Sequence, residues 1–323
     1  MRAAYANSAS FDDPLSALVV GEQPDPEAPP GWSKIAVKAA SLNHHDLWTL
    51  RGVGIKADRL PMILGCDAAG IDTASGAEVM VHGVITTPGW SGDETLDPGR
   101  TLLSEKHQGT MAEFVIVPSG NVLPKPPELS FTEAACLPTA WLTAYRMLFV
   151  RSDLRPGQTV LVQGASGGVA SACISLARAA GLRVWATARS EVKQQAALRF
   201  GAHAAFASGA RLPERVDAVM ETVGAATWSH SLRALKSGGR MVISGATSGF
   251  QPEATELNRI FFLSLSIVGS TMGTREELTD LTALLISTGL RPHIDRTLAL
   301  ADIGLGLRAI ESGDLLGKIV VEV

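Results

Sequence analysis

Residues 159–170, TVLVQGASGGVA, join an apolar run to a glycine-rich turn and the start of a helical pattern. The apolar, largely β-branched run 160–162 predicts a buried strand, the turn follows at 164–168, and apolar residues recur at helical spacing over 169–177. The first amides of such a helix have no intrahelical partner, and the helix dipole favours a negative charge beside them. This strand, turn and helix therefore predict a loop that binds the pyrophosphate of a dinucleotide.

The turn itself supplies the backbone for this contact. Glycine lets the main chain approach the phosphates closely, and Ala170 stands at the third position of the fingerprint, where a small residue packs against the strand. The candidate cofactor-binding residues of the loop are Ala165, Ser166, Gly167, Gly168 and Val169.

From about residue 137 onward, strand-like and helix-like segments alternate. Strands are expected at 159–163, 183–187, 204–207, 218–221, 241–244 and 266–269, and helices at 168–180, 191–200, 227–236 and 254–263. This alternation is typical of right-handed crossovers and predicts an α/β fold, a doubly wound parallel sheet with helices on both faces.

The two ends of the chain show a different pattern of predicted strands and helices. Short β-like runs separated by Pro and Gly occupy the first third, for example at 34–37 and 111–117. The C-terminal residues predict helices at 276–287 and 301–312 and a closing strand at 318–323. The doubly wound domain is therefore expected to be inserted in a mostly β domain built from both ends.

The composition describes a globular protein with two lobes. The 323 residues exceed one ordinary core, and 46% are hydrophobic and 19% charged. A net charge of −4 without a run of Lys and Arg gives no reason to expect nucleic acid as a partner. Three widely spaced cysteines suit a reducing compartment, and the apolar run 260–268 is too short to span a bilayer. We expect a cytoplasmic protein without a membrane partner.

Several segments, in order, resemble signatures of the medium-chain dehydrogenase/reductase superfamily over essentially the whole chain. They are SLNHHDLWTLRG (41–52), LPMILGCDAAG (60–70), GTMAEFVIVP (109–118), AACLPTAWLTAY (134–145), QGASGGVA (163–170), GSTMGT (269–274) and LLGKIVVEV (315–323). The resemblance is to the quinone oxidoreductase-like, zinc-independent branch of the zinc-type alcohol dehydrogenase family. It implies a GroES-like substrate and catalytic domain over 1–126 and 271–323, a Rossmann dinucleotide-binding domain over 127–270, and a cleft between them for the nicotinamide.

The end of the second strand indicates which dinucleotide to expect. A carboxylate there would bind both ribose hydroxyls and repel a 2′-phosphate, but none sits at the end of the strand at 183–187. Arg189, Ser190 and Lys193 stand there instead, and all three can donate to a phosphate. The pattern favours NADP(H) over NAD(H). An alternative stays open, in which Ser190 only caps the next helix and Lys193 is simply exposed.

Matching to alcohol-oxidising relatives places Asn43, Cys66 and Thr139 at the ligand positions of a catalytic zinc, and Asp67 at the carboxylate that follows. Neutral amide and hydroxyl groups are poor zinc ligands. The region 86–104, where these relatives carry four cysteines for a structural zinc, contains none. No metal is therefore expected.

An alternative is a metal recruited from the set His44, His45, Asp46, Cys66 and Asp67. Such a site needs four convergent ligands. We expect the segment that carries the first three to be extended, so that adjacent side chains project to opposite faces and do not converge.

The resemblance also marks candidates for catalysis. His45 lies where alcohol dehydrogenase relatives carry the hydroxyl that begins a proton relay, and an imidazole with a pKa of about 6.5 suits proton transfer. Asn43 is expected to hydrogen-bond a substrate carbonyl or a nicotinamide ribose hydroxyl, and Asp46 to orient the segment. A purely structural hydrogen bond of His45 is the open alternative. Contacts with the nicotinamide end of the cofactor are expected from Gly245, Ala246, Ser270, Thr271, Met272 and Lys318.

Without a Lewis acid, reduction of a simple ketone loses its main charge stabiliser, whereas a quinone or enone spreads the charge that arrives with a hydride. The sequence thus predicts an NADPH-dependent oxidoreductase whose small-molecule substrate is a quinone, an enone or a related carbonyl. Two alternatives stay open: an NADP(H)-dependent alcohol dehydrogenase or ketone reductase, and a non-catalytic NADPH-binding protein. An apolar edge strand at 265–269 also predicts a homodimer.

Overall fold

The computed structural model describes residues 1–323, which group by their contacts into two compact units. One unit, here the terminal unit, combines Met1–Leu142 with Met272–Val323; the other, the inserted unit, is Thr143–Thr271. Residues 127–142 group with the terminal unit. The domain limits expected from the sequence, 1–126 with 271–323 and 127–270, stay a prediction.

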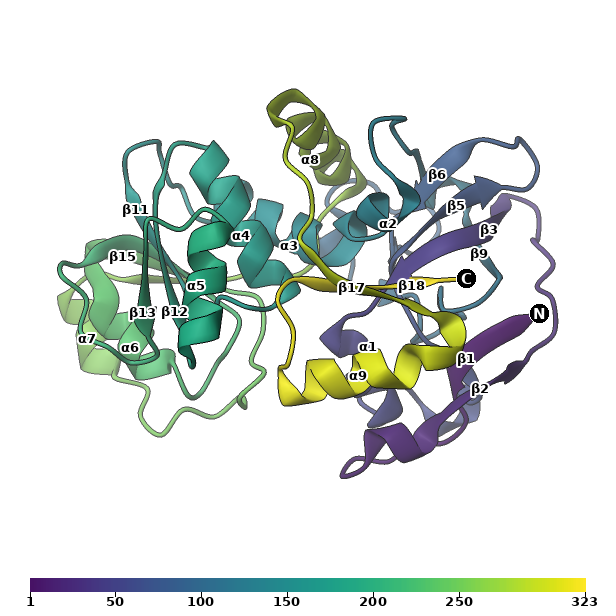
Figure 1. Cartoon of the computed structure of the whole chain (residues 1–323), viewed down its shortest axis with the longest axis horizontal. Coiled ribbons are helices and arrows are strands. Elements are labelled where there is room, and N and C mark those ends of the chain that lie inside the picture. The colour runs from purple at the N-terminus through teal and green to yellow at the C-terminus, as the bar shows by residue number, and fades with distance from the viewer. The chain divides into compact units, whose positions relative to one another are not determined.

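The inserted unit is built on a six-stranded parallel sheet. In spatial order its strands are β13 (Ala204–Ala207), β12 (Arg183–Ala188), β11 (Thr159–Val162), β14 (Val216–Glu221), β15 (Leu235–Ile243) and β16 (Ser266–Gly269). Helices α4 (Gly168–Ala179) and α5 (Glu191–Arg199) lie on one face, and α6 (Trp228–Ala234) and α7 (Leu257–Phe262) on the other (Figure 1). The predicted doubly wound parallel sheet is confirmed.

Strand β11 lies at the centre of this sheet, between β12 and β14. All four of its residues are buried, because helices cover both faces, and this explains the continuous apolar run in the sequence. Chain order reverses at β11, and the crevice beyond the carboxyl ends of the strands at such a point is where open α/β sheets bind ligands. The glycine-rich turn directly after β11 therefore lies at the expected ligand site.

Two helices are clearly shorter than predicted: α7 covers Leu257–Phe262 where the sequence predicts 254–263, and α6 is shortened as well. The sequence predicts a helix over 227–236, but α6 ends at Ala234 and the next residue, Leu235, already pairs with Val216 of β14. Helix α6 therefore ends early, because the backbone after Ala234 pairs with the neighbouring strand β14 instead of continuing the helix.

The terminal unit is mostly β. Its largest sheet follows the order β10 (Val122–Pro124), β6 (Glu78–Val81), β5 (Ala68–Asp72), β3 (Trp32–Ser41), β18 (Lys318–Glu322) and β17 (Ile294–Ala299), and β9 (Phe114–Pro118) also pairs with β3. Smaller sheets contain β2 (Leu18–Glu22), β1 (Arg2–Ala6) and β4 (Met62–Ile63), and β7 (Val84–Ile85) with β8 (Thr101–Leu102). The last strand, β18, pairs antiparallel with β3, so both ends of the chain build one sheet, as predicted.

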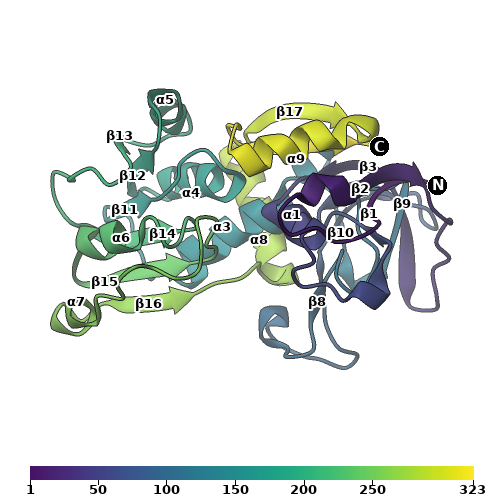
Figure 2. The same cartoon turned by 90° about the horizontal axis from the view of Figure 1, so that it is seen from below.

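Helices α1 (His44–Leu50) and α9 (Ile303–Ser312) lie side by side in this unit, and α9 covers β17 (Figure 2). Their apolar faces join one core, which includes Leu42, Leu47, Leu307 and Ile319. The remaining helices are α2 (Phe131–Ala134), α3 (Leu142–Tyr145) and α8 (Arg275–Thr288). Short 3₁₀ turns are η1 (Pro14–Ala17), η2 (Ala57–Arg59), η3 (Glu94–Leu96), η4 (Ser119–Asn121) and η7 (Leu300–Asp302). Two π-helical segments flank α3: η5 (Leu137–Trp141) in the terminal unit and η6 (Arg146–Val150) in the inserted unit. None of the helices combines the length and apolarity needed to cross a bilayer.

Candidate active site

The candidate catalytic segment begins where β3 ends at Ser41 and continues into α1. Oδ2 of Asp46, in the first turn of α1, accepts the backbone amide of Asn43 at 2.8 Å and caps the helix. Its Oδ1 accepts the amide of Gly65 at 2.8 Å and ties the helix to a neighbouring loop. The expectation of an extended segment at this position is wrong, because the Asp46 side chain caps a helix that starts directly after Asn43.

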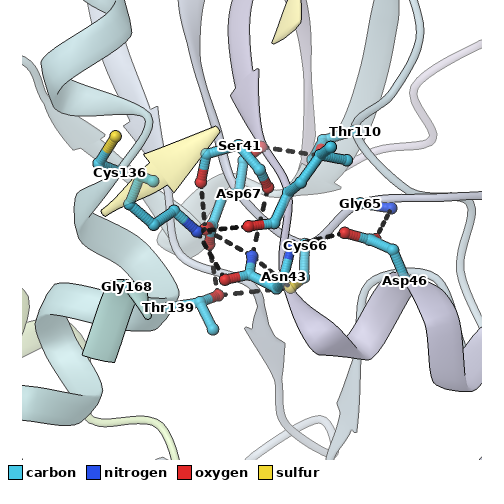
Figure 3. A network of polar contacts seen from close by, with 12 residues as sticks. Ser41, Asn43, Asp46, Gly65, Cys66, Asp67, Thr110, Cys136, Thr139 and Gly168 are labelled. Atoms are coloured by element: carbon cyan, nitrogen blue, oxygen red, sulfur yellow. Dashed lines mark hydrogen bonds and ion pairs between the residues drawn. The ribbon is translucent and has the colours of Figure 1, made fainter. Parts of the chain in front are cut away.

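A buried polar network lies beside this helix start (Figure 3). At its centre is Asp67, which is fully buried. Oδ2 of Asp67 accepts the Ser41 hydroxyl at 2.7 Å and Nδ2 of Asn43 at 2.8 Å, and Oδ1 accepts the Thr139 hydroxyl. We call this the Asp67 network; its members are Ser41, Asn43, Cys66, Asp67, Thr139 and Lys318.

Lys318 brings a positive charge into the Asp67 network. Its ammonium donates to the carbonyl of Leu42 and to Oδ1 of Asn43, both at 2.7 Å, and lies 3.7 Å from Oδ2 of Asp67. The side chain is only 2% exposed. An unpaired carboxylate at this depth would be strongly destabilising, so the ammonium compensates the charge of Asp67. The predicted contact of Lys318 with a cofactor stays a prediction.

The donor set does not fit a zinc ion. Of the three matched ligand positions, Asn43 and Thr139 offer neutral oxygen or nitrogen atoms that already hydrogen-bond within the network, and only Cys66 offers sulfur. The Lys318 ammonium contacts the same Asn43 oxygen that a cation would need. No group of three or more His, Cys, Asp or Glu side chains is placed to hold a metal ion, and on α1 successive side chains diverge by about 100°.

The Cys66 thiol is buried between Asn43 and Thr139. Its Sγ lies 3.3 Å from the Thr139 hydroxyl and 3.8 Å from Nδ2 of Asn43. Burial raises the pKa of this thiol, and the neighbouring Asp67 carboxylate raises it further. At neutral pH Cys66 is therefore a protonated thiol, a small packing group with a weak donor.

His45 lies in the first turn of α1. Its Nε2 faces Oε1 of Glu105 at 3.4 Å, while Nδ1 is buried and makes no hydrogen bond. Burial alone would lower the pKa of His45, but the side-chain contacts with Cys66 and Glu105 outweigh it and raise the pKa. Because the Cys66 thiol is itself protonated at neutral pH, the Glu105 carboxylate is the anion beside the ring that favours its charged form.

In the inserted unit, the glycine-rich turn leaves open space beside the start of α4. Gly164 has φ +70°, and a Cβ added at Gly167, the N-cap of α4, would meet no atom within 4 Å. The amide of Ser171 makes the first helical bond, to the carbonyl of Gly167, so the amides of 168–170 precede the hydrogen-bonded ladder. The amides of Gly168 and Val169 are thus available to a pyrophosphate, whereas those of Ala165 and Ser166 already donate to the carbonyls of Thr187 and Gly164.

The end of β12 leads into α5 through two exposed residues, Arg189 and Ser190. Ser190 caps α5, because its Oγ accepts the amide of Lys193 at 3.4 Å. The cap uses an acceptor lone pair of the hydroxyl, and its O–H can still donate to a phosphate. The structure is therefore compatible with both interpretations of Ser190 that the sequence leaves open.

Apart from Lys318, which begins β18, the residues predicted for the nicotinamide end follow the carboxyl ends of β15 and β16. Ser270 donates its amide to the carbonyl of Ile243 at 2.8 Å, which joins the two strand ends. A Cβ on Gly245 would lie 3.2 Å from the carbonyl oxygen of Thr222, so little space exists for a side chain. Ala246 and Thr271 complete this group within the inserted unit, and Met272 begins the second segment of the terminal unit.

Two polar residues of the site, Ser41 and Glu105, are not among those predicted from the sequence. Ser41 donates to Asp67, and Glu105 faces His45. The charged Asp67 within the apolar run 62–70 is a signal that could have pointed to a buried network. No local pattern distinguishes Glu105 from the other surface-type carboxylates in its loop.

The fold and the glycine-rich turn define the class, a Rossmann-type dinucleotide-binding protein with a mostly β partner domain. Two family models match the chain: "Alcohol dehydrogenase GroES-like domain" over residues 29–127 and "Zinc-binding dehydrogenase" over 168–287. The chain therefore belongs to the medium-chain dehydrogenase/reductase superfamily of NAD(P)-dependent oxidoreductases. The predicted combination of a Rossmann sheet and a GroES-like domain is confirmed.

Proteins similar to this chain are named after different reactions. The quinone oxidoreductase of Mus musculus is 30% identical over 78% of this chain and 75% of its own length. The crotonyl-CoA reductase of Streptomyces collinus is 27% identical over 96% of this chain and 82% of its own length. A solved structure described as an NAD-dependent alcohol dehydrogenase is 32% identical, covers both chains fully and superimposes with a TM-score of 0.92.

Proposed function

We propose that this protein is a zinc-independent, NADPH-dependent oxidoreductase that transfers a hydride to a quinone or an α,β-unsaturated carbonyl. The observation that carries the proposal is the Asp67 network, in which an internal ammonium, that of Lys318, compensates the carboxylate beside the matched ligand positions. A donor set of Asn43, Cys66 and Thr139 offers no adequate metal coordination.

The proposed substrate class follows from the lack of a site for a metal ion that could act as a Lewis acid. A simple ketone accumulates charge on one oxygen during reduction and benefits from a strong Lewis acid, whereas a conjugated acceptor delocalises the charge. The names of the relatives support the second class, since a quinone and a crotonyl thioester are both conjugated acceptors. The similarity to an alcohol dehydrogenase structure supports ketone or alcohol chemistry as a second candidate.

His45 is the proposed proton donor. The bound nicotinamide supplies the hydride, and the reduced acceptor then needs one proton on its enolate or quinol oxygen. The pKa of His45 is raised, and this direction favours the protonated imidazole that a general acid needs. Asp46 holds the helix start, and the Asn43 amide would bind the substrate carbonyl or a ribose hydroxyl by exchanging one of its bonds within the network.

NADP(H) is the proposed cofactor. The turn that includes Gly167 and Gly168 would hold the pyrophosphate, and Arg189, Ser190 and Lys193 would hold the 2′-phosphate. The exposed guanidinium of Arg189 and the absence of a carboxylate directly after β12 support this choice. NAD(H) is the competing cofactor, because the similar solved structure is described as an NAD-dependent alcohol dehydrogenase.

A homodimer joined through β16 is also proposed. This strand is at the edge of its sheet, and the adjacent α7 exposes Leu257 at 66%, Phe261 at 64% and Phe262 at 78%. An apolar surface beside an unpaired strand edge favours association with a second copy. The cytoplasm stays the proposed compartment, which the three free, buried cysteines support.

The central experiment measures NADPH oxidation by the purified protein with a panel of quinones, enones and enoyl thioesters, in buffer that contains a metal chelator. Turnover that persists in chelator and is not increased by added zinc is expected. Turnover that requires zinc would contradict the proposal. Oxidation of alcohols with NADP⁺, in preference to enone reduction, would favour the second candidate. Stabilisation by NADPH without consumption of any acceptor would favour a non-catalytic binding protein.

A further inference from the structure

Glu221 is a fully buried carboxylate at the carboxyl end of β14, in the inserted unit. Its Oε1 accepts the backbone amides of Val223 at 2.7 Å and Gly224 at 3.1 Å. Its Oε2 accepts the hydroxyls of Thr227 at 2.8 Å and Ser231 at 2.6 Å. Four donors thus surround a carboxylate that has no Lys or Arg as a partner.

The two amides belong to the segment that follows β14, residues 222–224, which we call the β14 turn. Oε1 binds this turn and Oε2 binds the first residues of α6, so one carboxylate fixes the turn relative to the strand and the helix. A buried carboxylate without a cation is stable only because its hydrogen bonds compensate the lost hydration. Placement of the β14 turn is therefore the contribution that distinguishes Glu221 from an apolar residue at this position.

The β14 turn packs against the turns on both sides of it, because β14 lies between β11 and β15 (Figure 2). A Cβ added to Gly164, in the glycine-rich turn after β11, would lie 2.7 Å from Cγ2 of Val223. A Cβ on Gly224 would lie 2.7 Å from Cα of Ala246, in the segment after β15. Neither side leaves space, so a shift of the β14 turn displaces the glycine-rich turn as well.

A chain of hydrogen bonds links Glu221 to the other side of the glycine-rich turn. Nε2 of Gln163 donates to the Ser231 hydroxyl at 2.9 Å, so that this hydroxyl is left to donate to Glu221. Oε1 of Gln163 accepts the hydroxyl of Thr187, at the end of β12. The carbonyl of Thr187 in turn accepts the amide of Ala165 at 2.9 Å. The glycine-rich turn is thus held from both neighbouring strands, and Glu221 takes part on both sides.

We infer that Glu221 is a positioning residue of the dinucleotide site: it holds the β14 turn and, through Val223, keeps the glycine-rich turn in the conformation that binds the pyrophosphate. This inference rests on the proposed function. Glu221 is buried and its oxygens already have partners, so it acts through the turns rather than by contact with the cofactor. Its loss should weaken NADPH and NADH alike, because the pyrophosphate is common to both.

The test replaces Glu221 by Leu, which is similar in size but has no acceptor, and by Gln, whose side-chain oxygen can still accept both amides. Titration by fluorescence should show dissociation constants for NADPH and NADH raised about tenfold or more in Glu221→Leu, and by less than about threefold in Glu221→Gln. The KM for NADPH should rise in parallel, while kcat at saturating NADPH stays within about twofold of the wild type, because the proposed proton donor belongs to the other unit.

Glu94→Leu is the matched control. It also removes a buried carboxylate, but one of the terminal unit, where Glu94 pairs with Arg275 at 2.5 Å. This change should lower the stability of the protein and leave both cofactor dissociation constants unchanged. If Glu221→Leu does not fold, Glu221→Asp takes its place, because the shorter side chain loses part of the four contacts and should raise both constants about threefold or more.

Hydrogen exchange of the cofactor-free protein gives a second measurement. Exchange in the β14 turn and the glycine-rich turn should be faster in Glu221→Leu or Glu221→Asp than in the wild type. Unchanged exchange, unchanged dissociation constants in these variants, or equal weakening in Glu221→Gln and Glu221→Leu would overturn the inference. A wild type that binds neither NADPH nor NADH would instead contradict the proposed function, and the exchange rates would still report whether Glu221 holds the two turns.

Discussion

The ammonium of Lys318 lies 2.7 Å from Oδ1 of Asn43, a residue 275 positions earlier in the chain. The contact forms because β18 pairs antiparallel with β3, which places the start of the last strand beside the end of the third. Lys318 also lies 3.7 Å from the Asp67 carboxylate, and both side chains are almost completely buried. The C-terminal strand thus supplies the charge that the central carboxylate of the network needs.

Lys318→Met should destabilise the protein by about 3 kcal/mol, because it leaves the Asp67 charge buried without a cation. Urea unfolding measures the change. Lys236→Met is the matched control, since Lys236 pairs with Asp217 at 2.9 Å but is 45% exposed, and it should cost less than about 1 kcal/mol. Addition of Asp67→Asn to Lys318→Met should recover part of the loss. Equal effects of the two lysine changes would argue against charge compensation by Lys318.

Arg189→Ala should weaken binding of NADPH on the order of 10- to 100-fold and leave NADH binding nearly unchanged, because only the 2′-phosphate needs the guanidinium. Titration of both cofactors by fluorescence or calorimetry gives the two dissociation constants. Arg199→Ala, at the opposite end of α5, is the control for the loss of one exposed positive charge. Similar losses of affinity for NADPH and NADH would contradict the proposal that Arg189 binds the 2′-phosphate.

His45→Phe should lower kcat by about 100-fold or more, since the general acid is lost, and leave the dissociation constant of NADPH unchanged. In the wild type, kcat should fall as pH rises through the raised pKa of His45, because the donor must be protonated. Steady-state kinetics over a pH series measures both effects. Unchanged turnover in His45→Phe would make this histidine structural.

The protein should elute as a dimer in gel filtration at micromolar concentration, because β16 and α7 present an unpaired edge beside exposed aromatic side chains. Phe262→Glu should shift the protein toward the monomer. Phe11→Glu, which replaces an equally apolar side chain that is 66% exposed on the other unit, should not. A monomeric wild type by light scattering would refute the proposed association.

Some features of the site could be predicted from the sequence and others could not. The pairing of Asn43 with Asp46 is a capping pattern, two polar residues three apart at the start of an apolar helical run, and it could have predicted α1 instead of an extended segment. Glu105 is different, because 60 residues separate it from His45 and their contact depends on how the segment at Ser104 packs against α1.

By itself the sequence determined the alternation of strands and helices, the glycine-rich turn and the lack of a carboxylate after β12, because periodicity and turn chemistry are local properties of the chain. Only the tertiary structure decided the end of α6, the surroundings of the Cys66 thiol, and the placement of the Lys318 charge beside Asp67. These depend on strand pairing and packing between residues far apart in the chain, and a buried charge is stable only where such packing brings a compensating group to it.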